Sequence, residues 1–206
     1  MIKLIDREPI PESWKNGYLK ILDPVIRFFA GKNVHPNTFT TLGFVLGCVA
    51  GYFAVKQLIK LSSLTLLISG IFDSVDGKLA RDSGKVTKFG ALYDSTLDRY
   101  SEAIFFFGVA YYFIQMNMHT TALVTAVALG GSLMVSYIRA RAEGLGFDCK
   151  VGILQRPERI LLIGIGGLIH QMALVVAIWI VAVLSNITAI VRMVHVWRED
   201  RRRREI

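Results

Sequence analysis

The chain has 206 residues, of which 53% are hydrophobic, and it carries a formal net charge of +8. Soluble domains are about 45–50% apolar even with glycine counted, so this composition argues against an ordinary soluble protein. A basic balance suits nucleic acid or a membrane surface; the apolar content favours the membrane, and we expect no nucleic-acid partner. The two cysteines lie too far apart in sequence for a disulfide framework or a zinc motif.

The N-terminal segment, residues 1–38, is predicted to lie beside the membrane. Within it, residues 11–31 carry apolar side chains near helical spacing with basic residues between them. This pattern is typical of an amphipathic helix on the membrane surface. The sequence HPN at 35–37 is expected to break the chain before the first membrane span.

Six apolar segments follow, and each is predicted to cross the membrane as a helix, for which about 20 apolar residues are needed. They are residues 39–55, 61–80, 89–115, 121–142, 160–171 and 173–197, of which the fifth is the shortest. HQM at 170–172 is expected to turn the chain between the last two. The predicted fold class is all-α: a polytopic membrane protein in which an amphipathic surface helix precedes six transmembrane helices (39–197) and a basic tail (198–206).

Basic residues are concentrated on one side of this predicted bundle. They lie in the N-terminal segment, in the loops after the second and fourth spans and in the tail, whereas the opposite side carries only Lys56 and Lys60. Because cytoplasmic loops are enriched in Lys and Arg, both termini and the polar chemistry are predicted to be cytoplasmic, in a multi-pass protein of the cell membrane.

Four aspartates at helical spacing are the strongest local signal. Asp73 and Asp76 lie three residues apart, and Asp94 and Asp98 lie four apart on the next helix. Residues three or four apart share a helix face, so two antiparallel helices would bring all four carboxylates together. Oxygen ligands of this kind suit Mg²⁺, or Mn²⁺, often alongside substrate phosphates. Asp82 fits neither face and is expected to be a solvated charge.

The pattern D-x-x-D-G-x-x-A-R-x8-G-x3-D-x3-D resembles the signature of the CDP-alcohol phosphatidyltransferases. Every fixed position is occupied in this chain, by Asp73, Asp76, Gly77, Ala80, Arg81, Gly90, Asp94 and Asp98. The resemblance covers nearly the whole chain and implies one domain over residues 1–206. It implies that the phosphatidyl group of a CDP-linked lipid is transferred to an alcohol while CMP leaves, and it suggests a homodimer.

The resemblance also implies roles for individual residues. Asp73, Asp76 and Asp94 would hold the metal, and Asp98 would be both a metal neighbour and the general base that takes the proton from the acceptor hydroxyl. A helix-capping role would explain Thr38 or Thr40 equally well, and a plain loop position would explain Thr87. The implied CDP-lipid site comprises Asn37, Thr38, Phe39, Thr40, Asp73, Gly77, Ala80, Arg81, Thr87 and Gly90.

Arginines beyond the aspartate motif carry the prediction of the acceptor. Several arginines that converge from different helices would make a phosphate pocket, which a neutral alcohol does not need, although Arg192 could instead snorkel to the interface. The candidates are Arg139, Arg159 and Arg192, followed by Arg141 and Arg156.

The segments SYIRARAE and RPER, and the ending RMVHVW, resemble phosphatidylinositol-phosphate synthases of actinobacteria and archaeal relatives that use an ether-lipid donor, with Arg139 in place of an expected Lys. This resemblance implies inositol 1-phosphate as the acceptor and CDP-diacylglycerol as the donor. The alternatives left open are glycerol 3-phosphate as the acceptor and a CDP-ether lipid as the donor.

Three other classes of membrane protein fit this sequence less well. A membrane prenyltransferase would have two well-separated Asp-rich motifs, and a transporter with an intramembrane carboxylate ion site would show mid-span charges and inverted repeats. A non-catalytic scaffold has no need of four acids in a membrane chain.

Overall fold

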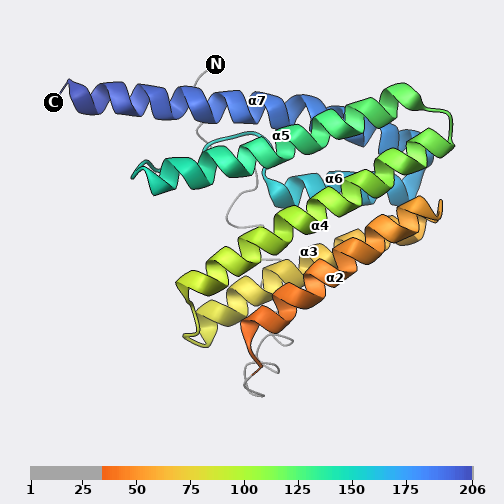
Figure 1. The fold of residues 1–206 in the computed structure, drawn as a ribbon, viewed down its shortest axis with the longest axis horizontal. Coiled ribbons are helices and arrows are strands. Elements are labelled where there is room, and N and C mark those ends of the chain that lie inside the picture. The colour runs from red at the N-terminus through yellow and green to blue at the C-terminus, as the bar shows by residue number, and fades with distance from the viewer. Residues whose placement is uncertain (1–33, 206) are drawn as a thin grey trace.

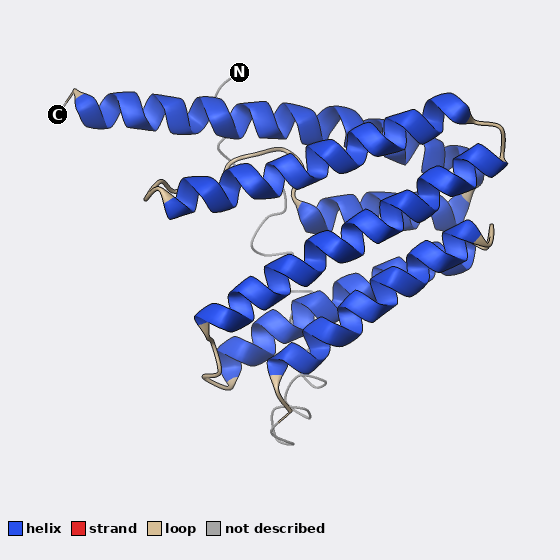
Figure 2. Cartoon of the chain, in the orientation of Figure 1, coloured by secondary structure: helices blue, strands red, loops and turns tan. Residues whose placement is uncertain are grey.

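The structure is a computed structural model that describes residues 34–205, and this part of the chain is made of helices and connecting loops (Figures 1 and 2). The all-α prediction is therefore confirmed for the described range. The amphipathic helix predicted at 11–31 lies outside it. The helices are α2 (Pro36–Val55), α3 (Ile59–Asp82), α4 (Lys88–Gln115), α5 (His119–Gly144), α6 (Arg156–Ile169) and α7 (Gln171–Arg204).

The helices form two groups that α6 connects. α2 packs against both α3 and α4, and α5 packs against both α4 and α7. The short α6 contacts α3 on one side and α7 on the other, and it lies between the two groups in Figure 1. Residues from α6 can therefore reach the polar ends of α3 and α4.

Local sequence explains where several helices begin. Pro36 occupies the first turn of α2, where its missing N–H costs nothing, and the His35 side chain accepts a hydrogen bond from the Asn37 N–H. Thr87 caps α4 by accepting a hydrogen bond from the Gly90 N–H at 2.9 Å. His170 has an extended backbone between α6 and α7, which confirms the turn predicted at 170–172.

Small residues bring α2 close to its two neighbours. A Cβ added to Gly108 of α4 would lie 2.3 Å from the Gly51 carbonyl oxygen of α2, so the two backbones touch. On the other side, the Ser69 hydroxyl of α3 donates to the Gly43 carbonyl at 2.8 Å. Such small-residue contacts are typical of helix packing in membranes. They set the distance between the aspartates of α3 and those of α4.

Three helices in the described range are long and apolar enough to cross a membrane: α2, α5 and α7. α3 and α4 have 24 and 28 residues, but they also carry the charged residues of the aspartate motif. α6 has 14 residues and is therefore about 21 Å long, less than the roughly 30 Å of a bilayer core. The prediction of six membrane spans is thus confirmed only as six helices with three candidate spans.

Candidate functional site

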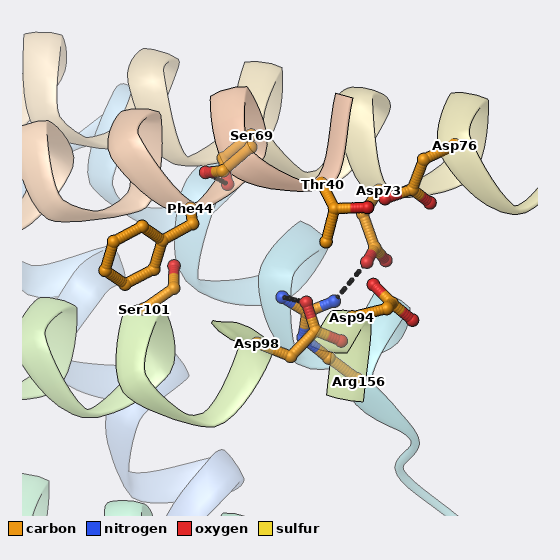
Figure 3. Close-up of a pocket in the computed structure, with 10 residues that line it drawn as sticks. Thr40, Phe44, Ser69, Asp73, Asp76, Asp94, Asp98, Ser101 and Arg156 are labelled. Carbon is orange, nitrogen blue, oxygen red and sulfur yellow. Dashed lines mark hydrogen bonds and ion pairs between the residues drawn. The ribbon is translucent and has the colours of Figure 1, made fainter. Parts of the chain in front are cut away.

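A polar pocket lies where α2, α4 and α6 begin and α3 approaches its end (Figure 3). The fold places these four helix ends together, although their residues are far apart in sequence. The pocket contains all four aspartates of the motif. Its lining consists of Thr40, Gly43, Phe44, Ser69, Asp73, Asp76, Asp94, Asp98, Ser101 and Arg156.

Three of the aspartates are arranged in a way that fits a divalent cation. Asp73, Asp76 and Asp94 each offer a carboxylate oxygen, and these oxygens lie within 4.8 Å of one another. Asp76 Oδ2 and Asp94 Oδ1 are buried without a hydrogen-bond partner, which is costly unless a ligand satisfies them. Mg²⁺ and Mn²⁺ favour such oxygen ligands. Asp98, predicted as a fourth ligand, lies outside this group of three.

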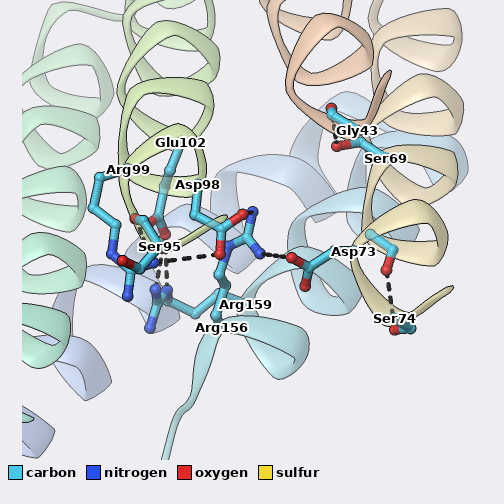
Figure 4. A network of polar contacts seen from close by, with 11 residues as sticks. Gly43, Ser69, Asp73, Ser74, Ser95, Asp98, Arg99, Glu102, Arg156 and Arg159 are labelled. Carbon is cyan, nitrogen blue, oxygen red and sulfur yellow. Dashed lines mark hydrogen bonds and ion pairs between the residues drawn. The ribbon is translucent and has the colours of Figure 1, made fainter. Parts of the chain in front are cut away.

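Asp98 instead contacts two guanidinium groups. Its Oδ1 lies 2.7 Å from Arg156 Nη2, and its Oδ2 lies 3.3 Å from Arg99 Nη1. Arg156 Nη1 lies 2.7 Å from Asp73 Oδ1, so this single guanidinium bridges an aspartate of α3 and an aspartate of α4 (Figures 3 and 4). The sequence grouped Arg156 with the acceptor arginines, whereas the structure places it among the aspartates.

A second ion pair joins α6 to α4, one helical turn further along both helices than the Arg156–Asp98 pair. Arg159 of α6 donates from Nε and Nη2 to Glu102 Oε1 of α4, at 3.1 and 2.9 Å (Figure 4). The Arg159 side chain is 1% exposed and that of Glu102 is 9% exposed. Sequence analysis missed Glu102 and Arg99. The four-residue step from Asp94 through Asp98 continues to Glu102 and could have identified it.

Several residues predicted to bind the CDP-lipid lie within one or two helical turns of the residues that line this pocket. A Cβ added to Gly90 would lie 2.9 Å from Thr87 Oγ1 and 3.5 Å from Asn37 Oδ1, so these three residues from two helix starts are neighbours. A side chain at Gly77 would meet Arg81 Nη1 at 3.6 Å, and Arg81 is exposed. The backbone at Gly77 is therefore open beside Arg81, whereas the space beside Gly90 is taken by the Thr87 hydroxyl.

Other predicted CDP-lipid residues have structural roles. The Phe39 side chain is buried in a small apolar cluster with Val75 and Leu79. The Thr87 hydroxyl caps α4. Thr38 is exposed and Ala80 is half-buried; of the ten predicted residues, only Thr40 and Asp73 line the pocket itself.

The candidate acceptor arginines do not all lie together. Arg192 is buried and donates to the carbonyls of Val151 and Val135, so it does not snorkel to the interface. Arg139 and Arg159 both lie within electrostatic range of Arg192. Arg139 also pairs with Glu143 at 2.8 Å. Arg141 is exposed on the last turn of α5.

The fold and the pocket together define a class of protein: a helical membrane protein with a carboxylate site for a divalent cation beside buried arginines suited to anions. The CDP-alcohol phosphatidyltransferase family matches residues 33–198, and the chain belongs to this family of enzymes. Family membership favours a transferase over the transporter, prenyltransferase and scaffold considered from sequence.

Two relatives are similar to this chain over most of its length. The archaetidylinositol phosphate synthase of Methanothermobacter thermautotrophicus is 39% identical over 195 residues, covering 92% of this chain and 97% of that protein. The phosphatidylinositol phosphate synthase of Mycobacterium tuberculosis is 32% identical over 199 residues, covering 91% of each chain.

Two crystal structures of the M. tuberculosis synthase have a similar fold. The form with CDP-DAG bound has a TM-score of 0.78 at 29% identity, covering 86% of this chain and 94% of that one. The form in complex with manganese and citrate has a TM-score of 0.77 at 30% identity, covering 84% and 88%.

Proposed function

We propose that this enzyme transfers the phosphatidyl group of CDP-diacylglycerol to inositol 1-phosphate, forming phosphatidylinositol phosphate and releasing CMP. The observation that carries the proposal is the pocket in which Asp73, Asp76 and Asp94 converge beside Asp98, with buried arginines close by. The relatives from M. thermautotrophicus and M. tuberculosis agree in the inositol phosphate part of their names.

The three clustered aspartates are proposed to hold one Mg²⁺, with Mn²⁺ as a substitute. A divalent cation held by these residues would neutralise charge on the diphosphate of the CDP-lipid and on the departing CMP. Asp98 accepts the proton of the acceptor hydroxyl, whose oxygen forms a bond to the lipid-side phosphorus. The bond from that phosphorus to the CMP oxygen then breaks.

The remaining site residues are proposed to bind the two substrates. Residues just outside the pocket lining, Asn37, Gly77, Arg81 and Gly90, receive the nucleotide, because the backbone at Gly77 is open beside the exposed Arg81. Arg139, Arg159 and Arg192 receive the acceptor phosphate, since Arg139 and Arg159 both lie within electrostatic range of the buried Arg192. Arg141, on the same helix as Arg139, is a further candidate.

An assay of CMP release tests the acceptor. Purified protein with CDP-diacylglycerol and Mg²⁺ is offered inositol 1-phosphate, glycerol 3-phosphate or free inositol in parallel. Release of CMP is expected only with inositol 1-phosphate. Turnover with glycerol 3-phosphate alone would overturn the acceptor assignment in favour of a phosphatidylglycerol-phosphate synthase.

A CDP-ether lipid is the second candidate donor, because the relative that is 39% identical is named for archaetidylinositol phosphate. Its test is a competition between the two donors at equal concentration in the same assay. A higher kcat/KM for the ester donor supports CDP-diacylglycerol as the donor. A higher kcat/KM for the ether donor would identify the CDP-ether lipid as the donor instead.

The membrane arrangement is proposed as one domain over residues 1–206, with an amphipathic surface helix, six helices within the membrane, a homodimeric assembly, and both termini and the pocket in the cytoplasm. Basic residues support this orientation, because Lys56 and Lys60 lie at the opposite end of the helices from the pocket. A cysteine replacing Arg202 should react with an impermeant maleimide only after the cells are opened, whereas one replacing Lys60 should react in intact cells.

A further inference from the structure

Arg156 stands out because one side chain uses its two terminal nitrogens on two different aspartates. Nη1 lies 2.7 Å from Asp73 Oδ1, and Nη2 lies 2.7 Å from Asp98 Oδ1. The Arg156 side chain is only 16% exposed. It reaches the pocket from α6, whereas the two aspartates come from α3 and α4 (Figure 4).

Asp73 is placed both to bind a divalent cation and to pair with the Arg156 guanidinium. It is one of the three carboxylates arranged for a divalent cation, and it is also the partner of Arg156. Two cations bound to one carboxylate repel each other, more strongly where access of water is limited, and the Asp73 side chain is only 28% exposed. Full use of Asp73 by a divalent cation therefore requires the guanidinium to withdraw from it.

The two halves of the bridge differ in how they are held. The two contacts are equally short, at 2.7 Å, but Asp98 is also held by Arg99 at 3.3 Å, whereas Asp73 lies among the three carboxylates arranged for a cation. The Arg156–Asp98 contact and the buried Arg159–Glu102 pair both join α6 to α4, one helical turn apart. Withdrawal from Asp73 therefore leaves α6 fixed on α4.

We propose that Arg156 is the built-in counter-ion of the pocket: it neutralises Asp73 and Asp98 in the metal-free protein, gives up Asp73 when the metal binds, and continues to hold Asp98 in place. Arg156 is thus a positioning residue that acts through Asp98. The inference depends on the metal site of the proposed function.

Metal affinity tests the counter-ion role without using activity. Mn²⁺ binding to purified protein in detergent is measured by electron paramagnetic resonance at pH 8, for the wild type, Arg156→Gln, Arg156→Lys and Arg202→Gln. Removal of the competing charge in Arg156→Gln should tighten Mn²⁺ binding on the order of tenfold. Arg156→Lys keeps a charge and should bind within about threefold of the wild type. Arg202 is on the exposed end of α7, so its variant should match the wild type.

Thermal unfolding with and without Mn²⁺ shows whether each variant is folded and gives a second measure of metal binding. Mn²⁺ should raise the Tm of Arg156→Gln by more than it raises the Tm of the wild type, because Asp73 then lacks its counter-ion until the metal binds. An equal Mn²⁺ affinity and an equal Tm increment in the two proteins would overturn the inference, as would weaker binding by the variant.

Kinetics test the positioning role. At saturating Mn²⁺, both Arg156 variants should lose at least about tenfold in kcat with little change in the KM of either substrate, because only the orientation of Asp98 is affected. A change confined to the acceptor KM would assign Arg156 to acceptor binding and overturn this role.

The variant Asp76→Asn separates this inference from the proposed function. If it binds Mn²⁺ as tightly as the wild type, the metal site itself is wrong and both proposals fall. If Mn²⁺ binding depends on Asp76 but does not respond to Arg156, only the counter-ion inference falls.

Discussion

Arg159 and Glu102 form an ion pair in the interior of the protein, with Nη2 and Oε1 2.9 Å apart and the arginine side chain 1% exposed. The pair joins α6 to α4 at a distance of 57 residues in sequence. A buried charge without a partner is far more costly than an exposed one, so the pair fixes the position of α6. Arg156 and the loop before it depend on that position.

Glu102→Ala should lower the free energy of unfolding by roughly 3–5 kcal/mol, because it leaves the Arg159 charge buried and alone. The measurement is chemical unfolding in detergent. Asp200→Ala, which removes an exposed pair with Arg204, is the control and should cost no more than about 1 kcal/mol. The double variant Glu102→Met, Arg159→Met should recover most of the loss; if it does not, the pair is not the cause.

Gly108→Ala should also destabilise the protein. Its Cβ would lie 2.3 Å from the Gly51 carbonyl oxygen, so α2 and α4 must separate, at a cost of roughly 1–3 kcal/mol. Gly130→Ala is the matched control, because nothing lies within 4 Å of an added Cβ there. Alanine is favoured over glycine inside a helix, so that variant should be unchanged or stabilised by up to about 1 kcal/mol. Equal effects would mean that the contact is not tight.

The aspartates could be predicted from sequence because their arrangement depends on helical spacing and on one short loop. Asp73 and Asp76 lie on one face of α3, Asp94 lies on α4, and the hairpin between these helices brings them together. The turn at His170 was predictable for a similar local reason, since length excluded a single helix.

The position of Arg156 could not be predicted in the same way. Its pairing with Asp73 and Asp98 depends on where α6 packs, and that is decided by contacts between residues far apart in sequence. The sequence grouped it with Arg159 because the two share the segment RPER. They are three residues apart, yet one reaches the aspartates and the other reaches Glu102.

Asp98→Asn should abolish turnover, with a loss in kcat on the order of 10²–10⁴, because the amide cannot accept the hydroxyl proton. The binding of Mn²⁺ and of the CDP-lipid should change little, since Asp98 lies outside the group of three carboxylates. Isothermal titration with each ligand provides the check. A variant that loses Mn²⁺ binding along with turnover would assign Asp98 to the metal instead.

Arg192→Gln should raise the KM for the acceptor by roughly 10- to 100-fold and leave the KM for the donor nearly unchanged, because a charge-assisted contact to phosphate is lost. Arg192 also fixes the loop before α6 through the Val151 carbonyl, so a loosened loop could produce a similar effect. Thr188→Val separates the two causes, because the Thr188 hydroxyl accepts hydrogen bonds from the N–H groups of Ile153 and Leu154 in that same loop. It loosens the loop without removing a charge and should leave the acceptor KM within about twofold of the wild type. If both variants raise the acceptor KM equally, Arg192 acts through the loop and does not bind the phosphate.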